Sequence, residues 1–266
     1  MIPATAPHEE VDLSPVISGE IWKEGNPSLI RWVSDWDCGY DTGWWYVIRE
    51  SPFDLSELSV SSRRNIRKAL RNCRVEKIDP SEWVEDLWRV FNEAIVRYEN
   101  YKVPFDKDGF VSEWVNNGNK EFWAGYDNKT DRMIGYAIFD VHTDWVNFRF
   151  AKYSAQYLKL RVSDAINTIV LKYYLNEAGK RYVSDGQRSI LHKTNVQTYL
   201  IEHFGYRKAY CRLHVRYRKL VEILVKIMYP IRKVLRKFDA IDGIHHLNSL
   251  LIMEEIVRIG KQHGEE

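Results

Sequence analysis

The chain has 266 residues and a mass of 31.6 kDa, which predicts one large or two small domains and excludes repeat arrays and miniproteins. Hydrophobic residues make up 45% and charged residues 29%, the balance of a globular protein rather than a disordered or fibrous one. The net charge is +2, but residues 1–60 contribute −8, so the remainder carries +10. The basic excess gathers over 63–74 and 207–237 and predicts a phosphate-bearing partner.

The spacing of the cysteines and the lack of long apolar runs indicate the cellular location. Cys38, Cys73 and Cys211 lie far apart with no CxxC pair, which excludes the usual zinc and disulfide frameworks. We therefore expect a reducing, cytoplasmic location. The N-terminus carries no basic region followed by an apolar one, and no run of about 18 apolar residues occurs. We expect neither export by a signal peptide nor a membrane-spanning segment.

The first part of the chain predicts a loose arm and then a short region of strands and one helix. Residues 1–19 hold three prolines and no apolar period. The expected elements that follow are a strand over 28–33, a strand over 44–49, a basic helix over 63–71 capped by Ser61 or Ser62, and a strand over 73–78. The turn-prone residues 37–43 predict that the first two strands form a hairpin.

From residue 73 onward the apolar patterns give the order β α α β β β α β α β. Strands are predicted over 73–78, 121–126, 133–140, 145–153, 181–184 and 207–217, and helices over 80–98, 108–116, 163–179 and 194–204. The short turn over 127–131 favours antiparallel pairing of the strands beside it. Alternation along the strand over 145–153 places Asn147, Arg149 and Tyr153 on one face.

The C-terminal part predicts two helices, the first from Leu220 and kinked at Pro230, the second over 243–259. One side of the first helix is apolar, formed by Val221, Leu224, Val225, Met228, Ile231, Leu235 and Phe238. The other side is basic, formed by Lys226, Arg232, Lys233, Arg236 and Lys237. The apolar side either packs on its own domain or belongs to a helix over 220–238 that lies on an acidic membrane surface.

The order of elements over 73–217 resembles the fold of the GNAT superfamily of N-acyltransferases. In that α/β fold a mixed, mostly antiparallel sheet is flanked by helices and splays open between its fourth and fifth strands to admit an acyl thioester. The segment from Asn195 to Tyr206 is similar to the fold's penultimate helix, with an early Asn and a closing Gly205 before the last strand. The upstream residues 44–48 and 63–67 resemble the front of uncharacterised relatives of the Fem-type aminoacyl transferases.

The resemblance implies a division of the chain into four parts. These are a loose arm (1–19), a partial GNAT-like half with the hairpin and the basic helix (20–72), a GNAT-like acyltransferase domain (73–218) and a C-terminal helical extension (219–266).

The resemblance also implies a donor, acyl-CoA or another acyl carrier, and no metal. Typical members hold a pyrophosphate on a glycine-rich turn at a helix N-terminus. Residues 154–163 contain no glycine, so we expect Lys159 and Arg161 to replace backbone donors by charge, or a larger carrier to dock mainly elsewhere. Ser163 and Asn195 complete the predicted donor site.

The basic helix allows two interpretations. Arg63, Arg64 and Arg67 belong to an ordinary solvated face, or they hold the phosphates of tRNA or of a nucleotide-linked sugar. In the second case Trp44 and Trp45 are available for stacking.

Amide-forming acyl transfer needs a base for the attacking amine. Asp185 and His192 follow the strand that borders the splayed region and are the candidate bases, although Asp185 could instead cap a turn and His192 could be structural. Tyr199 is the nearest substitute for the tyrosine with which many GNAT enzymes protonate the leaving thiolate. The predicted substrate-binding residues are Arg149, Tyr153 and Arg188, with a surface ion pair as the alternative for Arg188.

We therefore expect an N-acyltransferase that moves an acyl or aminoacyl group from a thioester or ester carrier to an amine, for example on an amino sugar or a cell-envelope precursor. A degenerate GNAT domain that serves as a non-catalytic binding or scaffold module is the alternative, because the glycines and the usual tyrosine are missing. The expected location is cytoplasmic, with peripheral membrane contact through 220–238 as the sharper possibility.

Overall fold

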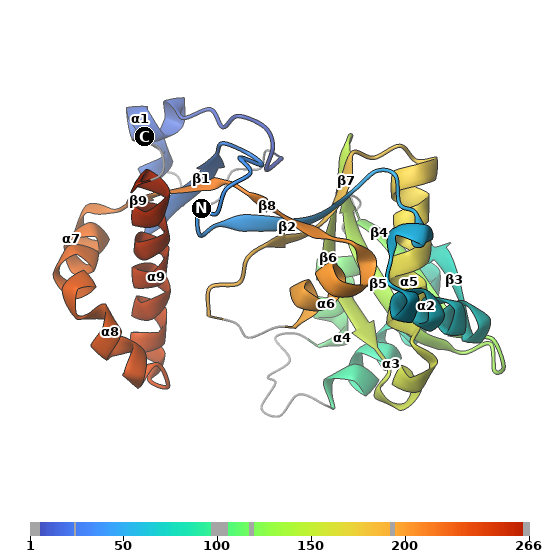
Figure 1. Cartoon of the computed structure of the whole chain (residues 1–266). Coiled ribbons are helices and arrows are strands. Elements are labelled where there is room, and N and C mark those ends of the chain that lie inside the picture. The colour runs from blue at the N-terminus through green and yellow to red at the C-terminus, as the bar shows by residue number, and fades with distance from the viewer. Residues whose placement is uncertain (1–5, 24, 97–105, 117–119, 192–194, 263–266) are drawn as a thin grey trace. The chain divides into compact units, whose positions relative to one another are not determined.

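The computed structural model describes residues 6–23, 25–96, 106–116, 120–191 and 195–262 (Figure 1). Contacts divide the chain into two compact units. The terminal unit comprises Met1–Tyr46, Gln187–Thr194 and Lys208–Glu266, and the central unit comprises Val47–Gly186 and Asn195–Arg207. The four-part division expected from the sequence stays a prediction.

A seven-stranded sheet forms the core of the central unit, in the strand order β3-β4-β5-β6-β7-β2-β8. Its strands are β2 (Trp45–Glu50), β3 (Cys73–Ile78), β4 (Lys120–Asp127), β5 (Met133–Val141), β6 (Trp145–Tyr153), β7 (Tyr182–Gln187) and β8 (Arg207–Tyr210). Strands β3 to β6 pair antiparallel, whereas β6 and β7 pair parallel. The mixed, mostly antiparallel sheet of a GNAT-like fold is thereby confirmed.

Helices cover both faces of this sheet. They are α2 (Val60–Asn72), α3 (Val84–Ile95), α4 (Lys107–Phe110), α5 (Val162–Leu171) and α6 (Val196–Phe204), with the shorter 3-10 or π segments η2 (Leu55–Glu57), η3 (Pro80–Trp83), η4 (Val111–Val115), η5 (Ala155–Leu160) and η6 (Lys172–Glu177). Helix α2 begins one turn earlier than expected, because the side chain of Ser59 accepts a hydrogen bond from the Ser62 N–H and caps it.

Helix α3 lies on one face of the sheet, and α5 lies on the other (Figure 1). The apolar residues Leu87 and Val90 of α3 face a cluster that includes Phe122 and Ile138 of the sheet. Their spacing is that of one helical face, so burial of this face fixes the helix. Helix α2 packs in turn on α5.

Two glycines let α5 approach the sheet closely. Gly125 and Gly135 are paired across β4 and β5. A Cβ at Gly125 would lie 2.4 Å from Cγ2 of Val162, and a Cβ at Gly135 would lie 2.8 Å from Cδ1 of Tyr153. These distances leave no room for a methyl group, so the start of α5 rests directly on the sheet.

We expect Gly125→Ala to destabilise the protein by about 1–3 kcal/mol, because the added methyl overpacks the contact with Val162. Denaturant unfolding measures the loss. Gly243→Ala is the matched control, since a Cβ at Gly243 meets nothing within 4 Å. Equal unfolding free energies for the two variants would contradict the close approach.

Strand β6 contains a β-bulge. Phe150 pairs with Ile138 and Phe148 pairs with Phe139, so Arg149 is an extra residue on β6. An extra residue interrupts the two-residue alternation and reverses the faces of the residues beyond it. The bulge therefore decides which side chains of β6 can act together.

The terminal unit joins a two-stranded sheet to helices from both ends of the chain. Its elements are α1 (Ser14–Ser18), η1 (Glu20–Trp22), β1 (Leu29–Ser34), β9 (Arg212–Tyr217), α7 (Lys219–Met228), η7 (Tyr229–Ile231), α8 (Arg232–Leu235), η8 (Arg236–Phe238) and α9 (Asp242–Gln262). Its core joins Trp44 and Leu213 to Met253 and Ile256 of α9. The break expected at Pro230 is confirmed, because α7 ends at Met228.

Two predictions about strands are wrong. The expected hairpin over 28–49 does not form, because β1 pairs with β9 and β2 joins the larger sheet. The expected strand over 207–217 is two strands, divided at Cys211, whose carbonyl accepts a hydrogen bond from the Thr42 hydroxyl. Turn signals are local, whereas burial of β1 and β9 against α9 is a long-range effect that outweighs them.

The apolar side predicted for the first C-terminal helix is also wrong in part. Val225 is buried as expected, but Leu224, Ile231 and Phe238 are exposed. Both sides of this segment carry apolar residues, so periodicity alone did not identify the inner one.

Among the described residues, no helix is both long and apolar enough to cross a bilayer. In the same part of the chain, no group of three or more His, Cys, Asp or Glu side chains is placed to hold a metal ion. The three cysteines are free thiols.

Candidate functional site

The sheet opens between β6 and β7. The two strands pair only from Trp145 to Asn147 on β6 and from Tyr182 to Ser184 on β7. Beyond Asn147, β6 continues to Tyr153 while β7 diverges from it. This is the separation between the fourth and fifth strands that the GNAT resemblance implies.

Asp185 lies on β7 directly after the last paired residue, inside the strand rather than beyond it as expected. Burial raises the pKa of Asp185 to about 7, although a hydrogen bond with Gln197 of α6 acts to lower it. Gly186 has a φ of +81°, and its N–H donates to Ser184 Oγ at 2.9 Å, which turns the backbone after Asp185. A carboxyl with a pKa near 7 can accept a proton at neutral pH.

Asp185, Arg49 and Tyr153 all act on the electrostatics of one residue, Tyr206. Tyr206 is buried, and burial raises the pKa of its phenol far above the usual range, with the charge of Asp185 as the next cause. The charge of Arg49 lowers that pKa and Tyr153 raises it. The guanidinium carbon of Arg49 would lie 3.7 Å from a Cβ at Gly205, the residue before Tyr206. The Tyr206 hydroxyl therefore keeps its proton at neutral pH.

A second network lies at the N-terminus of α5. Arg161 precedes the helix with a φ of +64°, and its Nε donates to Asp164 Oδ2 at 2.6 Å. Tyr199 donates to the other oxygen of Asp164, whose side chain is only 3% exposed. Ser163 Oγ lies 3.4 Å from the same carboxylate.

This network changes the expected roles of Arg161 and Tyr199. Arg161 already neutralises Asp164, and the Asp164 carboxylate sits in the first turn of α5, where a helix favours an anion. The N-terminus of α5 therefore already holds an anion, which takes the position that a phosphate would use. Burial raises the pKa of Tyr199, and the Asp164 charge adds to the effect, so Tyr199 is a weak proton donor.

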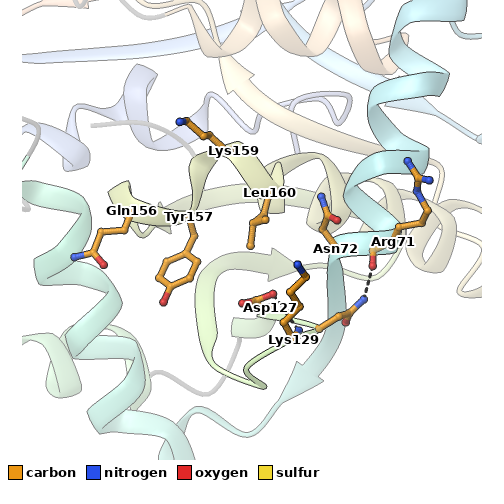
Figure 2. Close-up of a pocket in the computed structure, with 9 residues that line it drawn as sticks. Arg71, Asn72, Asp127, Lys129, Gln156, Tyr157, Lys159 and Leu160 are labelled. Carbon is orange, nitrogen blue, oxygen red and sulfur yellow. Dashed lines mark hydrogen bonds between the residues drawn. The ribbon is translucent and has the colours of Figure 1, made fainter.

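A pocket of about 280 Å³ opens beside η5 (Figure 2). Its lining comes from α2, the turn after β4 and η5, namely Arg71, Asn72, Asp127, Asn128, Lys129, Gln156, Tyr157, Lys159 and Leu160. Figure 2 shows Tyr157 and Leu160 directed into the pocket, while the Lys159 ammonium points away from its centre. Asp127 is occupied within its own turn, where it accepts from Lys129 N and Thr130 Oγ1.

A second pocket of about 480 Å³ adjoins α2. It is lined by Arg64, Arg67, Leu70 and Arg71, so Arg71 belongs to both pockets. Within the described chain, no carboxylate lies within 4.0 Å of the five cations of the two pockets, which together we name the basic surface: Arg64, Arg67, Arg71, Lys129 and Lys159.

Arg63 is not part of the basic surface. Its guanidinium donates to the carbonyl oxygens of Ser56 and Leu58 at 2.7 and 3.1 Å. These hydrogen bonds hold the segment before α2 against the helix. The helical pattern in the sequence could not indicate this role of Arg63.

The expected stacking role of the two tryptophans is wrong for Trp44, which is completely buried in the terminal unit. Trp45 is covered in the same unit by Lys208 and Arg188, at 3.9 and 4.5 Å from its ring. Arg188 also donates to the Gly43 carbonyl, and burial lowers its pKa. These contacts favour a structural role for Arg188.

The remaining predicted residues are dispersed. Arg149 is half exposed and lies 3.8 Å from Asp140. Asn147 pairs with Asp140 and Tyr153 pairs with Gly135, which puts Asn147 and Tyr153 on opposite faces. The prediction that Asn147, Arg149 and Tyr153 share one face is therefore wrong, because the bulge reverses the alternation.

Of the two residues predicted on the segment before α6, the structure describes only Asn195. Asn195 is at the N-cap position of α6, is exposed and makes no side-chain capping bond. His192 lies outside the described residues. Asp185 and Tyr153 both raise the pKa of Tyr206, a residue that sequence reasoning did not select although it directly follows Gly205.

No protein-family model and no curated protein matches the chain. Solved structures do match. The crystal structure of FemX has a TM-score of 0.55 at 10% identity and covers 73% of this chain and 73% of its own. L-PGS from Bacillus licheniformis has a TM-score of 0.49 at 14% identity, with 78% of this chain and 74% of its own covered.

A third match is an aminoglycoside acetyltransferase from an uncultured soil metagenomic sample, with a TM-score of 0.35 at 14% identity over 50% of this chain and 84% of its own. Of these three, FemX exceeds a TM-score of 0.5. The chain has a GNAT-like fold that resembles the Fem-type relatives.

Proposed function

We propose that the protein is an N-acyltransferase that moves an acyl or aminoacyl group from an ester or thioester carrier to an amine. The observation that carries the proposal is the half-buried carboxyl of Asp185, with a pKa of about 7, at the point where β6 and β7 separate. A structural carboxylate is normally stabilised by charge partners, which lower its pKa. Asp185 is instead left ready to exchange a proton at neutral pH.

Asp185 acts as the base in this scheme. The amine nitrogen attacks the carbonyl carbon of the donor, a C–N bond forms, and the carbonyl electron pair moves to oxygen. The Asp185 carboxylate accepts the proton that the nitrogen loses. When the intermediate collapses, the bond to the carrier breaks, and the protonated Asp185 returns that proton to the departing oxygen or sulfur.

The neighbouring residues of the cluster support the charge changes of this reaction. Tyr206 keeps its proton because its pKa is raised, so it can donate a hydrogen bond to a developing oxyanion. Arg49 is 14% exposed and paired to Glu57 at 2.6 Å, so the pair adds no net charge beside the cluster.

The donor in this proposal is a carrier larger than coenzyme A, with aminoacyl-tRNA as the first candidate. The turn before α5 lacks glycine, and the carboxylate of Asp164, paired with Arg161, already occupies the helix end that would otherwise receive a pyrophosphate. The basic surface offers phosphate contacts along α2 and η5 instead. Side-chain cations suit the extended backbone of a nucleic acid.

A transfer assay tests the proposal. The full chain is incubated with labelled aminoacyl-tRNAs, or with acetyl-CoA and longer acyl-CoAs, together with amino sugars and amine-bearing envelope precursors. We expect a labelled amide from aminoacyl-tRNA. An amide formed from an acyl-CoA alone would keep the transferase but overturn the choice of donor.

The second candidate is a non-catalytic binding module, favoured by the missing glycines and by the Asp164 carboxylate that occupies the N-terminus of α5. Calorimetry separates the two functions. Donor binding without an amide product from any donor and acceptor pair would establish the module and overturn the transferase.

A further inference from the structure

A row of apolar side chains is exposed along the segment that runs from α7 to η8. Its members are spaced by three or four residues, so they follow one side of the segment through the break at Pro230. We name this set the apolar row: Leu220, Ile223, Ile227, Ile231, Val234 and Phe238, each 47–79% exposed.

The other side of the same segment holds it in place within the terminal unit. Val225 is buried, and α7, α8 and η8 all contact α9 (Figure 1). Arg232 and Arg236 both bind Glu255 of α9, the first at 3.2 Å. The segment is therefore anchored through one side, and the exposure of the apolar row is a consequence of that anchoring.

Lysines accompany the apolar row. Lys219, Lys226, Lys233 and Lys237 are all exposed, and the first three recur every seventh residue. Lys226 pairs with Glu222, while Lys219, Lys233 and Lys237 have no carboxylate within 4.0 Å among the described residues. The surface beside the row is therefore positively charged.

An exposed apolar row flanked by lysines matches an anionic lipid surface. Apolar side chains enter the boundary between headgroups and acyl chains, while lysines remain at the headgroups and contact phosphates. A second copy of the chain fits less well, because a two-fold contact through the row would bring the two sets of lysines together. Charge complementarity therefore favours an anionic membrane over a second copy of the chain as the partner of this surface.

We propose that residues 219–238 form a membrane-docking surface that places the apolar row in the interface of an anionic bilayer. This site does not depend on the proposed transfer chemistry, since it lies in the terminal unit and uses none of the residues around Asp185. The proposal assigns the peripheral membrane contact expected through 220–238 to the side of the segment that carries the apolar row.

Vesicle sedimentation tests the surface. The full chain is mixed with phosphatidylcholine vesicles, or with vesicles that contain 30% phosphatidylglycerol, at low and high salt. We expect binding to the anionic vesicles at least tenfold tighter than to the neutral ones, and weaker at high salt. Equal partitioning in all four conditions overturns the proposal.

Variants assign the binding to this face. We expect Ile223→Ser combined with Ile227→Ser to weaken vesicle binding tenfold or more. Lys233→Gln combined with Lys237→Gln should weaken it about 25-fold, at about fivefold for each lysine. Ile17→Ser and Lys68→Gln are the matched controls, because both side chains are exposed but lie outside the segment, and we expect them to bind like the parent.

Two further measurements exclude other occupants. Thermal unfolding of the Ile223→Ser and Ile227→Ser variant should match that of the parent, and a clear loss of stability would mean that the row packs within the protein. Sedimentation equilibrium should show the same oligomeric state for both. A parent dimer that this variant converts to a monomer would assign the row to a second copy and overturn the lipid proposal.

Discussion

Asp185→Asn is expected to lower turnover by two to four orders of magnitude, because the amide cannot accept the proton that the attacking amine loses. The donor KM should change little, since the basic surface is intact. Steady-state transfer assays measure both constants. Asp131→Asn is the matched control, because Asp131 is an exposed acid in the turn between β4 and β5, and we expect its activity to be that of the parent.

The pH dependence separates Asp185 from His192. With a pKa of about 7 for Asp185, the parent rate should rise with pH around that value. An unperturbed histidine, with a pKa of about 6.5, gives nearly the same curve, so the parent profile alone does not identify the base. The rise should disappear in Asp185→Asn. A residual rate that still rises near pH 7 would assign the base to His192.

The same substitution should stabilise the protein at alkaline pH. Asp185 binds its proton more tightly in the folded chain, with a pKa of about 7, than in the unfolded chain at the usual 3.8. The free energy of unfolding of the parent therefore falls as pH rises from about 4 through 7, while that of Asp185→Asn lacks this component. Urea unfolding at pH 5 and pH 8 should show a larger difference at pH 8. An unchanged difference would contradict the half-buried carboxyl.

The sequence predicted the central sheet because its signals there are local. The segments that became β3 to β7 carry clear apolar or alternating patterns, and Gly205 closes α6 with a φ of +69° as the motif indicates. Asp185 could be selected because a polar residue after a buried strand is visible in the sequence. Its raised pKa could not, because burial is supplied by residues remote in the chain.

The wrong predictions have a common cause: each depends on a contact between residues far apart in the sequence. The partner of β1 is β9, near the other end of the chain, and no turn signal near β1 indicates it. The bulge at Arg149 depends on the register with β5, so alternation along β6 put Asn147 and Tyr153 on one face although they lie on opposite faces. Arg49 was overlooked for the same reason, since only the folded chain brings it near Tyr206.

The basic surface is another feature that depends on long-range contacts and that the sequence alone did not indicate. The sequence indicated the cations of α2 as one run and Lys159 as part of a separate turn, and it assigned no role to Lys129. Folding brings the turn after β4 and η5 to the end of α2, where Arg71 lines both pockets. A surface assembled from three segments is suited to a ligand with several phosphates rather than to a single anion.

We expect the triple variant Arg71→Gln, Lys129→Gln, Lys159→Gln to raise the KM for aminoacyl-tRNA by about two orders of magnitude. The reason is that each exposed cation near a phosphate raises the affinity for the donor about fivefold. The turnover number should stay within a few-fold of the parent, since these residues hold the donor away from the reacting atoms. The logarithm of the tRNA-binding constant should be measured against the logarithm of the salt concentration. The slope of this plot should fall in magnitude by about three, about one for each lost phosphate contact.

Arg74→Gln is the matched control for this surface. Arg74 is a partly exposed cation close to α2, but Glu76 and Asp131 both lie 2.9 Å from its guanidinium and neutralise it. We expect the control to keep the donor KM and the salt slope of the parent. If the triple variant lowered the turnover number and left the KM and the slope unchanged, the three cations would act on the reaction instead of the carrier, and the phosphates would have to bind at another face of the central unit.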